Sequence, residues 1–285
     1  QPALSMMIQK LEEELNVKIF DRSKHPVEPT DIGKRVINQA RISLTYFKQI
    51  KDVVENEQNT VKGVFKLGII PTIAPYLVPV ILEKQNSKYK DIELILKENT
   101  TNNLISEIQK GIMDGGLMAG PLNYPELMEY PLYYEKFYAY VSPLDEKYQK
   151  KKINLDEIDI NEVWLLENEH CLRGQIERLC QMKREAAGGN VSVKYESGSI
   201  DTLIHIVDYN HGITIIPEMH AMGLSEDKQE NLREFENVTA VREVSLIISK
   251  EYVRKAMLQI ILEIIKSSVP KSMQNPELKQ YAVNL

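Results

Sequence analysis

The chain has 285 residues, a length that allows two domains and a third small domain. Its hydrophobic fraction of 43% and charged fraction of 27% are typical of globular proteins. No stretch approaches the roughly 18 consecutive apolar residues of a membrane span. Two cysteines are too few for the disulfide framework of a secreted protein, and by count alone they are two inert, buried thiols.

The net charge of −6 is distributed unevenly and argues against a protein that coats nucleic acid non-specifically. Residues 1–51 contain nine Lys and Arg against six acidic residues, so this segment is +3 and the remainder −9. A basic end on an acidic body is typical of a small nucleic-acid-binding module attached to a larger sensing domain.

The first 31 residues predict a helix followed by a two-stranded wing. Leu4, Ile8, Leu11 and Leu15 recur at helical spacing, which predicts an amphipathic helix over residues 3–15. The turn-rich stretch 21–29 is typical of a wing, and Thr30 or Asp31 can cap the next helix. Because the chain opens with Gln1 inside a helical pattern, we expect an earlier N-terminal segment to be missing.

A long helix is predicted over residues 32–54. Its apolar residues fall at intervals of three and four, at Ile37, Ala40, Leu44, Phe47, Ile50 and Val54. This spacing suits packing against a partner helix, although an ordinary helix packed on its own domain has the same pattern. We favour a dimerisation helix, because the polar linker 55–60 follows it.

Strand and helix patterns alternate from Val61 onward. We expect strands at 65–70, 92–96, 115–119, 163–166, 191–195, 212–216 and 244–248. We expect helices at 76–85, 102–110, 172–186, 200–209 and 253–265. The alternation predicts α/β layers with largely parallel sheets, and about 210 residues suggest two subdomains with a cleft between them.

The residues best suited to chemistry surround the first cysteine. Cys171 lies between a predicted strand and a predicted helix, and a helix N-terminus favours a thiolate. His170 and Arg173 can add positive charge and stabilise a departing oxygen, although a capping or salt-bridge role is as consistent with their spacing. Cys180 follows nine residues later, where a redox sensor would carry its resolving thiol.

A helix over these residues would keep the two cysteines apart. Nine helical residues advance about 13.5 Å and end on the opposite face. A disulfide requires Cα atoms within about 7 Å. The helix and a bond between Cys171 and Cys180 are therefore mutually exclusive, and oxidation would have to unwind or bend most of residues 172–180.

The string His-Cys-Leu-Arg at 170–173, with a second cysteine nine residues after the first, resembles the redox motif of the OxyR family. Members of that family are the hydrogen-peroxide sensors among LysR-type transcriptional regulators. Segments shared by LysR-type regulators in general are matched by residues 1–5, 11–15, 20–22, 29–33, 67–72 and 212–217. The resemblance thus extends along nearly the whole chain.

The resemblance implies a role for each matching residue. Cys171 corresponds to the cysteine that reacts with peroxide and Cys180 to the resolving one. The residues corresponding to the peroxide pocket are Thr72, Thr101, His170, Arg173 and Arg242. Read from the sequence alone, either threonine could simply cap a helix.

The chain departs from the family pattern at Gly174, where an aspartate is common. The glycine removes a potential carboxylate partner of Arg173 and costs a helix up to about 1 kcal/mol relative to Ala.

The DNA-facing residues follow from the recognition helix and wing. The residues predicted to contact DNA are Gln1, Pro2, Ser5, Arg22 and Lys24. The first three would read base edges and the two cations would contact phosphate, unless Lys24 and His25 form only a solvated surface.

The expected fold is a multi-domain α+β protein. A partial winged helix-turn-helix (1–31) and a linker or dimerisation helix (32–60) would precede an α/β regulatory domain resembling a periplasmic binding protein. That domain would comprise subdomain I (61–134), subdomain II with the cysteines (135–239), and a return to subdomain I with a C-terminal helix (240–285).

The expected function is peroxide-activated transcriptional regulation through a reversible Cys171–Cys180 disulfide in the bacterial cytoplasm, with no enzymatic activity, metal or cofactor. The implied partners are promoter DNA, RNA polymerase, hydrogen peroxide, further copies in a dimer or tetramer, and a reductant such as glutaredoxin or thioredoxin. Two alternatives stay open, a LysR-type regulator of a small organic ligand and a thiol peroxidase, and a solute-binding protein is disfavoured by the DNA-binding features.

Overall fold

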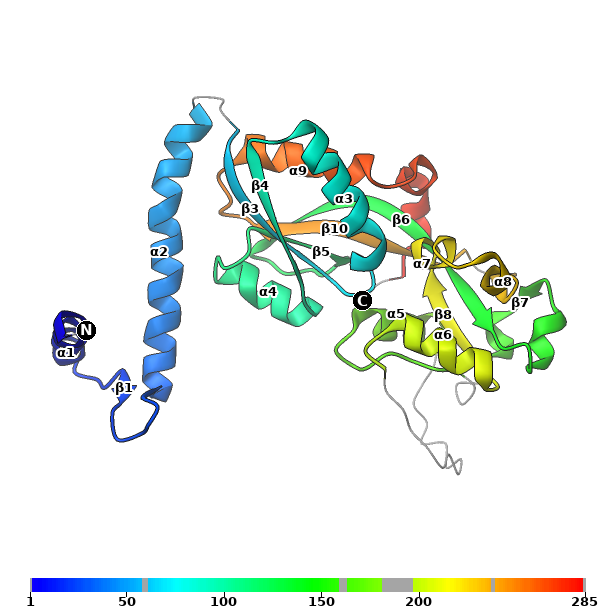
Figure 1. The fold of residues 1–285 in the computed structure, drawn as a ribbon, viewed down its shortest axis with the longest axis horizontal. Coiled ribbons are helices and arrows are strands. Elements are labelled where there is room, and N and C mark those ends of the chain that lie inside the picture. The colour runs from blue at the N-terminus through cyan, green and yellow to red at the C-terminus, as the bar shows by residue number, and fades with distance from the viewer. Residues whose placement is uncertain (1, 58–60, 159–162, 181–196, 237–238, 284–285) are drawn as a thin grey trace.

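Three N-terminal elements precede the α/β part of the chain. The structure, a computed structural model, describes residues 2–57, 61–158, 163–180, 197–236 and 239–283. Helix α1 (Pro2–Glu14) leads into a short antiparallel hairpin of β1 (Phe20–Asp21) and β2 (Glu28–Pro29), and helix α2 (Asp31–Glu57) follows. The predicted helix, wing and long helix are confirmed, and Figure 1 shows α1 and the hairpin at the N-terminal end of α2.

A buried carboxylate fastens the wing to α1. Glu12 accepts backbone hydrogen bonds from Ile19 (2.7 Å) and Phe20 (3.0 Å), and Arg22 and Lys18 lie 3.8 and 3.9 Å from its other oxygen. The Phe20 amide, the Ile19 amide and the two cations together hold the pKa of Glu12 below its usual value. The carboxylate therefore ties the helix to the wing in its charged form.

Thr30, rather than Asp31, caps α2. Its hydroxyl accepts the Gly33 backbone N–H (2.9 Å) and donates to the Lys18 carbonyl (2.6 Å), so it links the wing to the helix. Gly33 lies so close to the wing that a Cβ at this position would be 1.8 Å from the Ile19 carbonyl oxygen. The Gly33 position therefore admits no side chain unless the wing moves.

The apolar stripe predicted on α2 faces outward where its side chains are described. Leu44, Phe47 and Ile50 are exposed, whereas Ile37 is half-buried. The Val54 side chain lies outside the described residues. Within the described part of the chain, no helix has the length and apolarity needed to cross a bilayer.

The first α/β unit begins with three parallel strands. Strand β3 (Gly63–Ile69) pairs with both β4 (Ile92–Glu98) and β5 (Gly115–Gly120). Helices α3 (Ala74–Lys88) and α4 (Thr101–Gln109) connect them, and α9 (Lys255–Ser267) packs beside α3. The strands and helices predicted between residues 65 and 119 are confirmed.

Two long strands join this unit to the next. Strand β6 (Leu127–Val141) pairs antiparallel with β10 (Val241–Ser249), and β10 pairs antiparallel with β5. The order across the sheet is β4-β3-β5-β10-β6-β9-β7, with β8 also paired to β6. The expectation of largely parallel sheets is therefore wrong, because the two longest strands make antiparallel ladders.

The second unit is built on the other end of β6. Strands β8 (Ile213–Pro217) and β9 (Leu232–Phe235) pair antiparallel with β6, and the short β7 (Lys152–Ile153) pairs parallel with β9. Its helices are α5 (Cys171–Leu179), α6 (Ile200–Tyr209), α7 (Glu218–Met222) and α8 (Glu226–Gln229). Short 3₁₀ helices lie at Glu146–Gln149, Leu155–Glu157, Lys271–Gln274 and Pro276–Tyr281.

The predictions for the second unit are met unevenly. The helix at 200–209 and the strand near 212–216 are confirmed. The strand expected at 163–166 is reduced to isolated bridges at Val163 and Leu166. The strand at 191–195 and the end of the helix at 172–186 lie outside the described residues.

Two apolar cores correspond to the two units. One core contains residues from β3, α3, α4, β5, α9 and one end of each of β6 and β10, and the other contains residues from β6, α5, α6 and β8. On β6 the change of core falls between Tyr133 and Phe137, and where the chain returns along β10 it falls between Ala240 and Val244. We propose that the boundaries between the regulatory subdomains lie at these two places.

Acid should release the wing from α1 through Glu12. A carboxylate whose pKa is lowered in the folded state contributes stability above its unfolded pKa and loses it as the pH falls through the folded pKa. The protection factors of the Ile19 and Phe20 amides, taken relative to the intrinsic exchange rate at each pH, should therefore fall as acid protonates Glu12, and Glu12→Ala should show low protection already at pH 7. The control is Glu13→Ala, which removes an exposed carboxylate from the same helix. Equal exchange rates in the two variants would contradict the role of Glu12.

Candidate functional site

The two cysteines lie at opposite ends of α5. Cys171 is the first residue of the helix, as predicted, and Cys180 is the residue that ends it. Both thiols are free and partly buried. Cys171 packs against the core of the first unit, whereas Cys180 packs against the core of the second. Helix α5 thus presents one thiol to each core, and Figure 1 shows it near the boundary between the two units.

The helical conformation keeps the thiols from bonding. Nine residues of α-helix separate the two Cα atoms by about 14 Å. A disulfide needs a separation below about 7 Å. A bond between the two cysteines therefore requires α5 to lose much of its helical form, and at least one thiol must leave the core it packs against.

Burial makes the Cys180 thiol poorly reactive in the dithiol form. Removal from solvent raises the pKa of Cys180 to about 12, so this group is a neutral thiol at physiological pH. A thiolate is the nucleophile in reactions with peroxides. The arrangement therefore disfavours Cys180 as the first group to react.

The residues flanking Cys171 have different surroundings. His170 precedes the first helical residue, but its side chain makes no capping hydrogen bond. Arg173 is buried, and its guanidinium donates from Nη1 to the Leu166 carbonyl (2.9 Å) and from Nε to Glu177 (3.0 Å). Arg173 thus has the salt-bridge role that its spacing allows, with a carboxylate one helical turn later.

Thr72 and Arg242 are in direct contact. The Arg242 Nη1 group donates to the Thr72 hydroxyl (2.9 Å) and Nη2 donates to the Thr72 carbonyl (3.1 Å). Thr72 follows β3 and Arg242 lies on β10, so the contact spans 170 residues of sequence. Thr72 does not cap α3, because the residue at the N-cap is Ile73.

Arg242 is also the cation of a fully buried ion pair. Its Nε lies 2.7 Å from Glu135 Oε1, and the two residues are directly opposite each other on β10 and β6. Neither side chain is exposed to solvent. The other Glu135 oxygen accepts the Met219 backbone N–H of α7 (3.1 Å). Glu135 therefore connects Arg242, and through it Thr72, to a helix of the second unit.

The charge of Arg242 acts on two neighbouring rings. Burial lowers the pKa of His220 in α7, and the Asp201 carboxylate only partly offsets this effect. The positive charge of Arg242 also lowers the pKa of His220, which falls to about 4. Burial raises the pKa of Tyr133 well above its usual value, with Glu135 acting in the same direction and Arg242 against it. Both rings are therefore neutral at pH 7. His220 also contacts Tyr76 of α3 edge to face, with 4.9 Å between ring centroids.

Thr101 supplies a buried polar atom without a partner. It is the first residue of α4, and the capping position belongs to Thr100. Its hydroxyl is buried and has no hydrogen-bond partner among the described residues. Buried hydroxyls in native proteins nearly always have a partner, so this one is available for a bound polar molecule.

The predicted DNA-facing residues lie on α1 and the wing. Pro2 and Ser5 are exposed on α1, and Gln1 lies outside the described residues. Arg22 lies 3.8 Å from Glu12, and Lys24 is 2.8 Å from Glu28 on the other wing strand. Both wing cations therefore have an intramolecular carboxylate that competes with phosphate.

Two carboxylates of the site were not identified in the sequence. Glu177 follows Arg173 by four residues, and this spacing alone could have indicated the pair. Glu135 lies in β6, where no strand was predicted, and a lone acidic residue among aromatic neighbours was its only signal.

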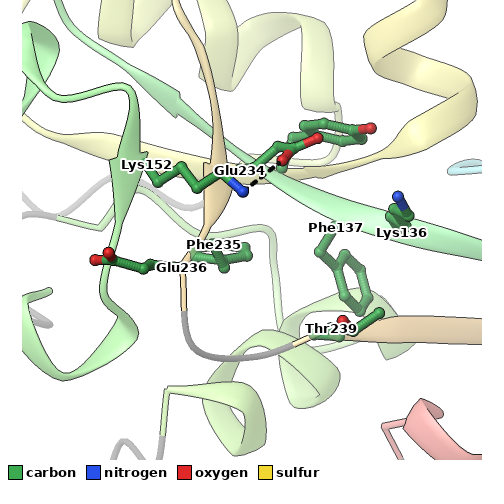
Figure 2. Close-up of a pocket in the computed structure, with 9 residues that line it drawn as sticks. Lys136, Phe137, Lys152, Glu234, Phe235, Glu236 and Thr239 are labelled. Carbon is green, nitrogen blue, oxygen red and sulfur yellow. Dashed lines mark ion pairs between the residues drawn. The ribbon is translucent and has the colours of Figure 1, made fainter.

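A polar cavity of about 260 Å³ lies away from these residues, beside β6, β7 and β9. Figure 2 shows the Lys152–Glu234 ion pair (3.3 Å) at this cavity, together with Phe137 and Phe235. Both charged side chains are about half exposed, with values of 54% and 53%. None of the predicted site residues lines this cavity.

Comparison with known proteins agrees with this architecture. Residues 58–270 match the LysR substrate binding domain, and residues 1–34 match the bacterial regulatory helix-turn-helix protein, lysR family. The chain is 31% identical to the hydrogen peroxide-inducible genes activator of Haemophilus influenzae, over 77% of this chain and 71% of that protein.

Solved structures give the same result. The OxyR structure from Porphyromonas gingivalis has a TM-score of 0.68 and 30% identity, over 75% of this chain and 96% of that one. A full-length OxyR variant from Pseudomonas aeruginosa has a TM-score of 0.75 and 25% identity, over 93% of this chain and 88% of that one.

A winged helix-turn-helix joined by a long helix to two α/β units is the architecture of a LysR-type transcriptional regulator. Within that class, the chain belongs to the family of the hydrogen peroxide-inducible genes activators, or OxyR proteins.

Loss of Glu135 should destabilise the protein strongly. Glu135→Ala leaves the Arg242 charge buried without its partner, and breaking such a pair costs about 3–5 kcal/mol. The measurement is urea unfolding followed by circular dichroism. The control is Glu234→Ala, which removes one partner of an exposed pair and should cost at most about 1 kcal/mol. Similar losses in the two variants would contradict the importance of the buried pair.

Proposed function

We propose that this chain is a transcriptional regulator that senses hydrogen peroxide through Cys171 and Cys180. The observation that carries the proposal is the placement of the two thiols at the two ends of one short helix, each packed against a different core. A bond between them cannot form without rearranging the contact between the two units. Oxidation would thereby change how the regulatory part holds the DNA-binding part.

The chemistry uses two electrons from the two thiols and one peroxide molecule. The Cys171 thiolate attacks one peroxide oxygen, the O–O bond breaks, and the departing hydroxide takes a proton to become water. Cys171 is then a sulfenic acid. The Cys180 thiol attacks its sulfur, the S–S bond forms, and the sulfenic oxygen leaves as a second water. A thiol reductant such as glutaredoxin or thioredoxin would return both thiols.

The predicted pocket residues have complementary hydrogen-bonding capacity. Thr101 offers a buried hydroxyl with no partner among the described residues, and Arg242 holds the Thr72 hydroxyl in place. His170, next to Cys171, and Arg173, two residues after it, carry N–H groups that can donate hydrogen bonds to the departing oxygen. We propose that these residues surround peroxide when it reacts with Cys171.

The output would be altered binding of promoter DNA and RNA polymerase. The exposed apolar stripe of α2, with Leu44, Phe47 and Ile50, suits a helix of a second copy. Tetramers would add contacts between the regulatory parts. The same architecture disfavours a thiol peroxidase, since a peroxidase has no use for a winged helix. A regulator of an organic ligand would respond to that ligand without Cys171.

Serine substitutions should separate the roles of the two cysteines. Cys171→Ser should abolish oxidation by stoichiometric peroxide, whereas Cys180→Ser should still form a sulfenic acid at Cys171, which dimedone traps. Mass spectrometry of the tryptic peptides measures both products. Trapping in Cys171→Ser but not in Cys180→Ser would reverse the assignment. Sustained peroxide turnover with excess thiol reductant would favour the peroxidase instead.

Oxidation should remove hydrogen-exchange protection from α5. The amides of residues 172–180 should exchange slowly in the dithiol form and fast in the disulfide form. Gly174→Ala meets open space and should favour the helix by up to about 1 kcal/mol, slowing exchange in the dithiol form by up to about fivefold. The disulfide form of the same variant serves as the control, because it should exchange as the wild type does. Equal protection in both redox forms, with the bond confirmed by mass, would contradict this mechanism.

A further inference from the structure

Arg173 links α5 to the segment before it. This side chain is buried and reaches back to the Leu166 carbonyl, which precedes the loop before the helix. It also reaches forward to Glu177 within the helix. Leu166 in turn bridges to Ser197, so the guanidinium connects α5 to the backbone of the second unit.

Glu177 supplies a carboxylate that residue 174 cannot. Gly174 follows Arg173 directly and has no side chain, and the space around its Cα is open. The Glu177 side chain is about one-third exposed, at 32%, and its Oε1 lies 3.0 Å from Arg173 Nε. Residues four apart face each other only while the turn between them is helical. The pair therefore forms only while α5 is helical, and it stabilises that form.

The Arg173–Glu177 pair lies inside the segment that a disulfide would shorten. The pair spans four of the nine intervals between Cys171 and Cys180. The two Cα atoms must approach by about 7 Å for the bond to form. The Leu166 contact resists this movement, because it holds the Arg173 side chain to a fixed carbonyl near the start of the segment.

We propose that Glu177 is a positioning residue that sets the redox equilibrium of the cysteine pair. It stabilises the dithiol form by holding Arg173 in the helix, and this contribution is lost in the disulfide form. The inference rests on the proposed disulfide switch. The equilibrium in question is the exchange of the protein disulfide with two glutathione thiols, which yields the protein dithiol and one glutathione disulfide.

The test measures this equilibrium in the full chain by titration with glutathione redox buffers and mass spectrometry. Glu177→Gln keeps the size and helix propensity of the side chain but removes its charge. We expect it to favour the disulfide by about threefold to tenfold, which lowers the midpoint potential by about 15–30 mV. Glu177→Asp, which shortens the side chain but keeps the charge, should lie between Glu177→Gln and the wild type.

The matched control is Glu169→Gln. Glu169 is exposed and lies two residues from Cys171, so its removal changes the local charge by the same amount without touching the pair. Loss of a nearby negative charge favours a thiolate, and a thiolate belongs to the dithiol form. Glu169→Gln should therefore either change the disulfide–dithiol equilibrium by less than twofold or shift it toward the dithiol. A shift in Glu169→Gln equal to that in Glu177→Gln would overturn the inference.

A double substitution tests whether the effect runs through Arg173. In an Arg173→Gln background, Glu177→Gln should have no further effect on the equilibrium. An undiminished shift, or no shift in Glu177→Gln alone, would overturn the inference even though the disulfide forms. Absence of any Cys171–Cys180 disulfide in the wild type after peroxide would instead refute the proposed function.

Discussion

The ion pair between Arg242 and Glu135 is the interaction on which the arrangement of the two units depends. Burying two charges is costly, and attraction offsets the cost only when both groups have further hydrogen bonds. Here Arg242 donates to Thr72 and Glu135 accepts from Met219. Thr72 belongs to the first unit and Met219 to the second, so the pair holds both units from the strands between them. The conformation around Thr72 and the position of α7 therefore depend on one pair of side chains.

Helix α5 is the complementary element in the proposed switch, because a Cys171–Cys180 disulfide would require it to unwind. Its short length and its glycine at position 174 lower the cost of unwinding it, and the Arg173–Glu177 pair opposes that unwinding. The buried pair on β6 and β10 provides a fixed frame against which such a change produces a defined movement. A rigid junction and an adaptable helix at one boundary are the physical requirements of a switch between two states.

The sequence predicted those parts of the fold that local pattern determines. The spacing of Leu4, Ile8 and Leu11 indicated α1, and the position of Cys171 at a helix start was correct. Strand β6 was missed because Pro131, several tyrosines and Glu135 interrupt the apolar pattern, and its core switches along its length. The antiparallel ladders were missed with it, since pairing over more than 100 residues leaves no local signal. The assignment of Thr72 and Arg242 to one pocket came from the family resemblance, whereas their direct contact and the partner Glu135 required the structure.

The continuous course of β6 through both cores, with β10 paired beside it, determines what kind of movement the units can make. A slide of one strand along the other by a single residue would break the ladder and turn every side chain to the opposite face of the sheet. Translation between the units is therefore strongly opposed, whereas a change in the twist of the two strands preserves their hydrogen bonds. A change passed from one unit to the other along these strands would therefore take the form of a rotation rather than a slide.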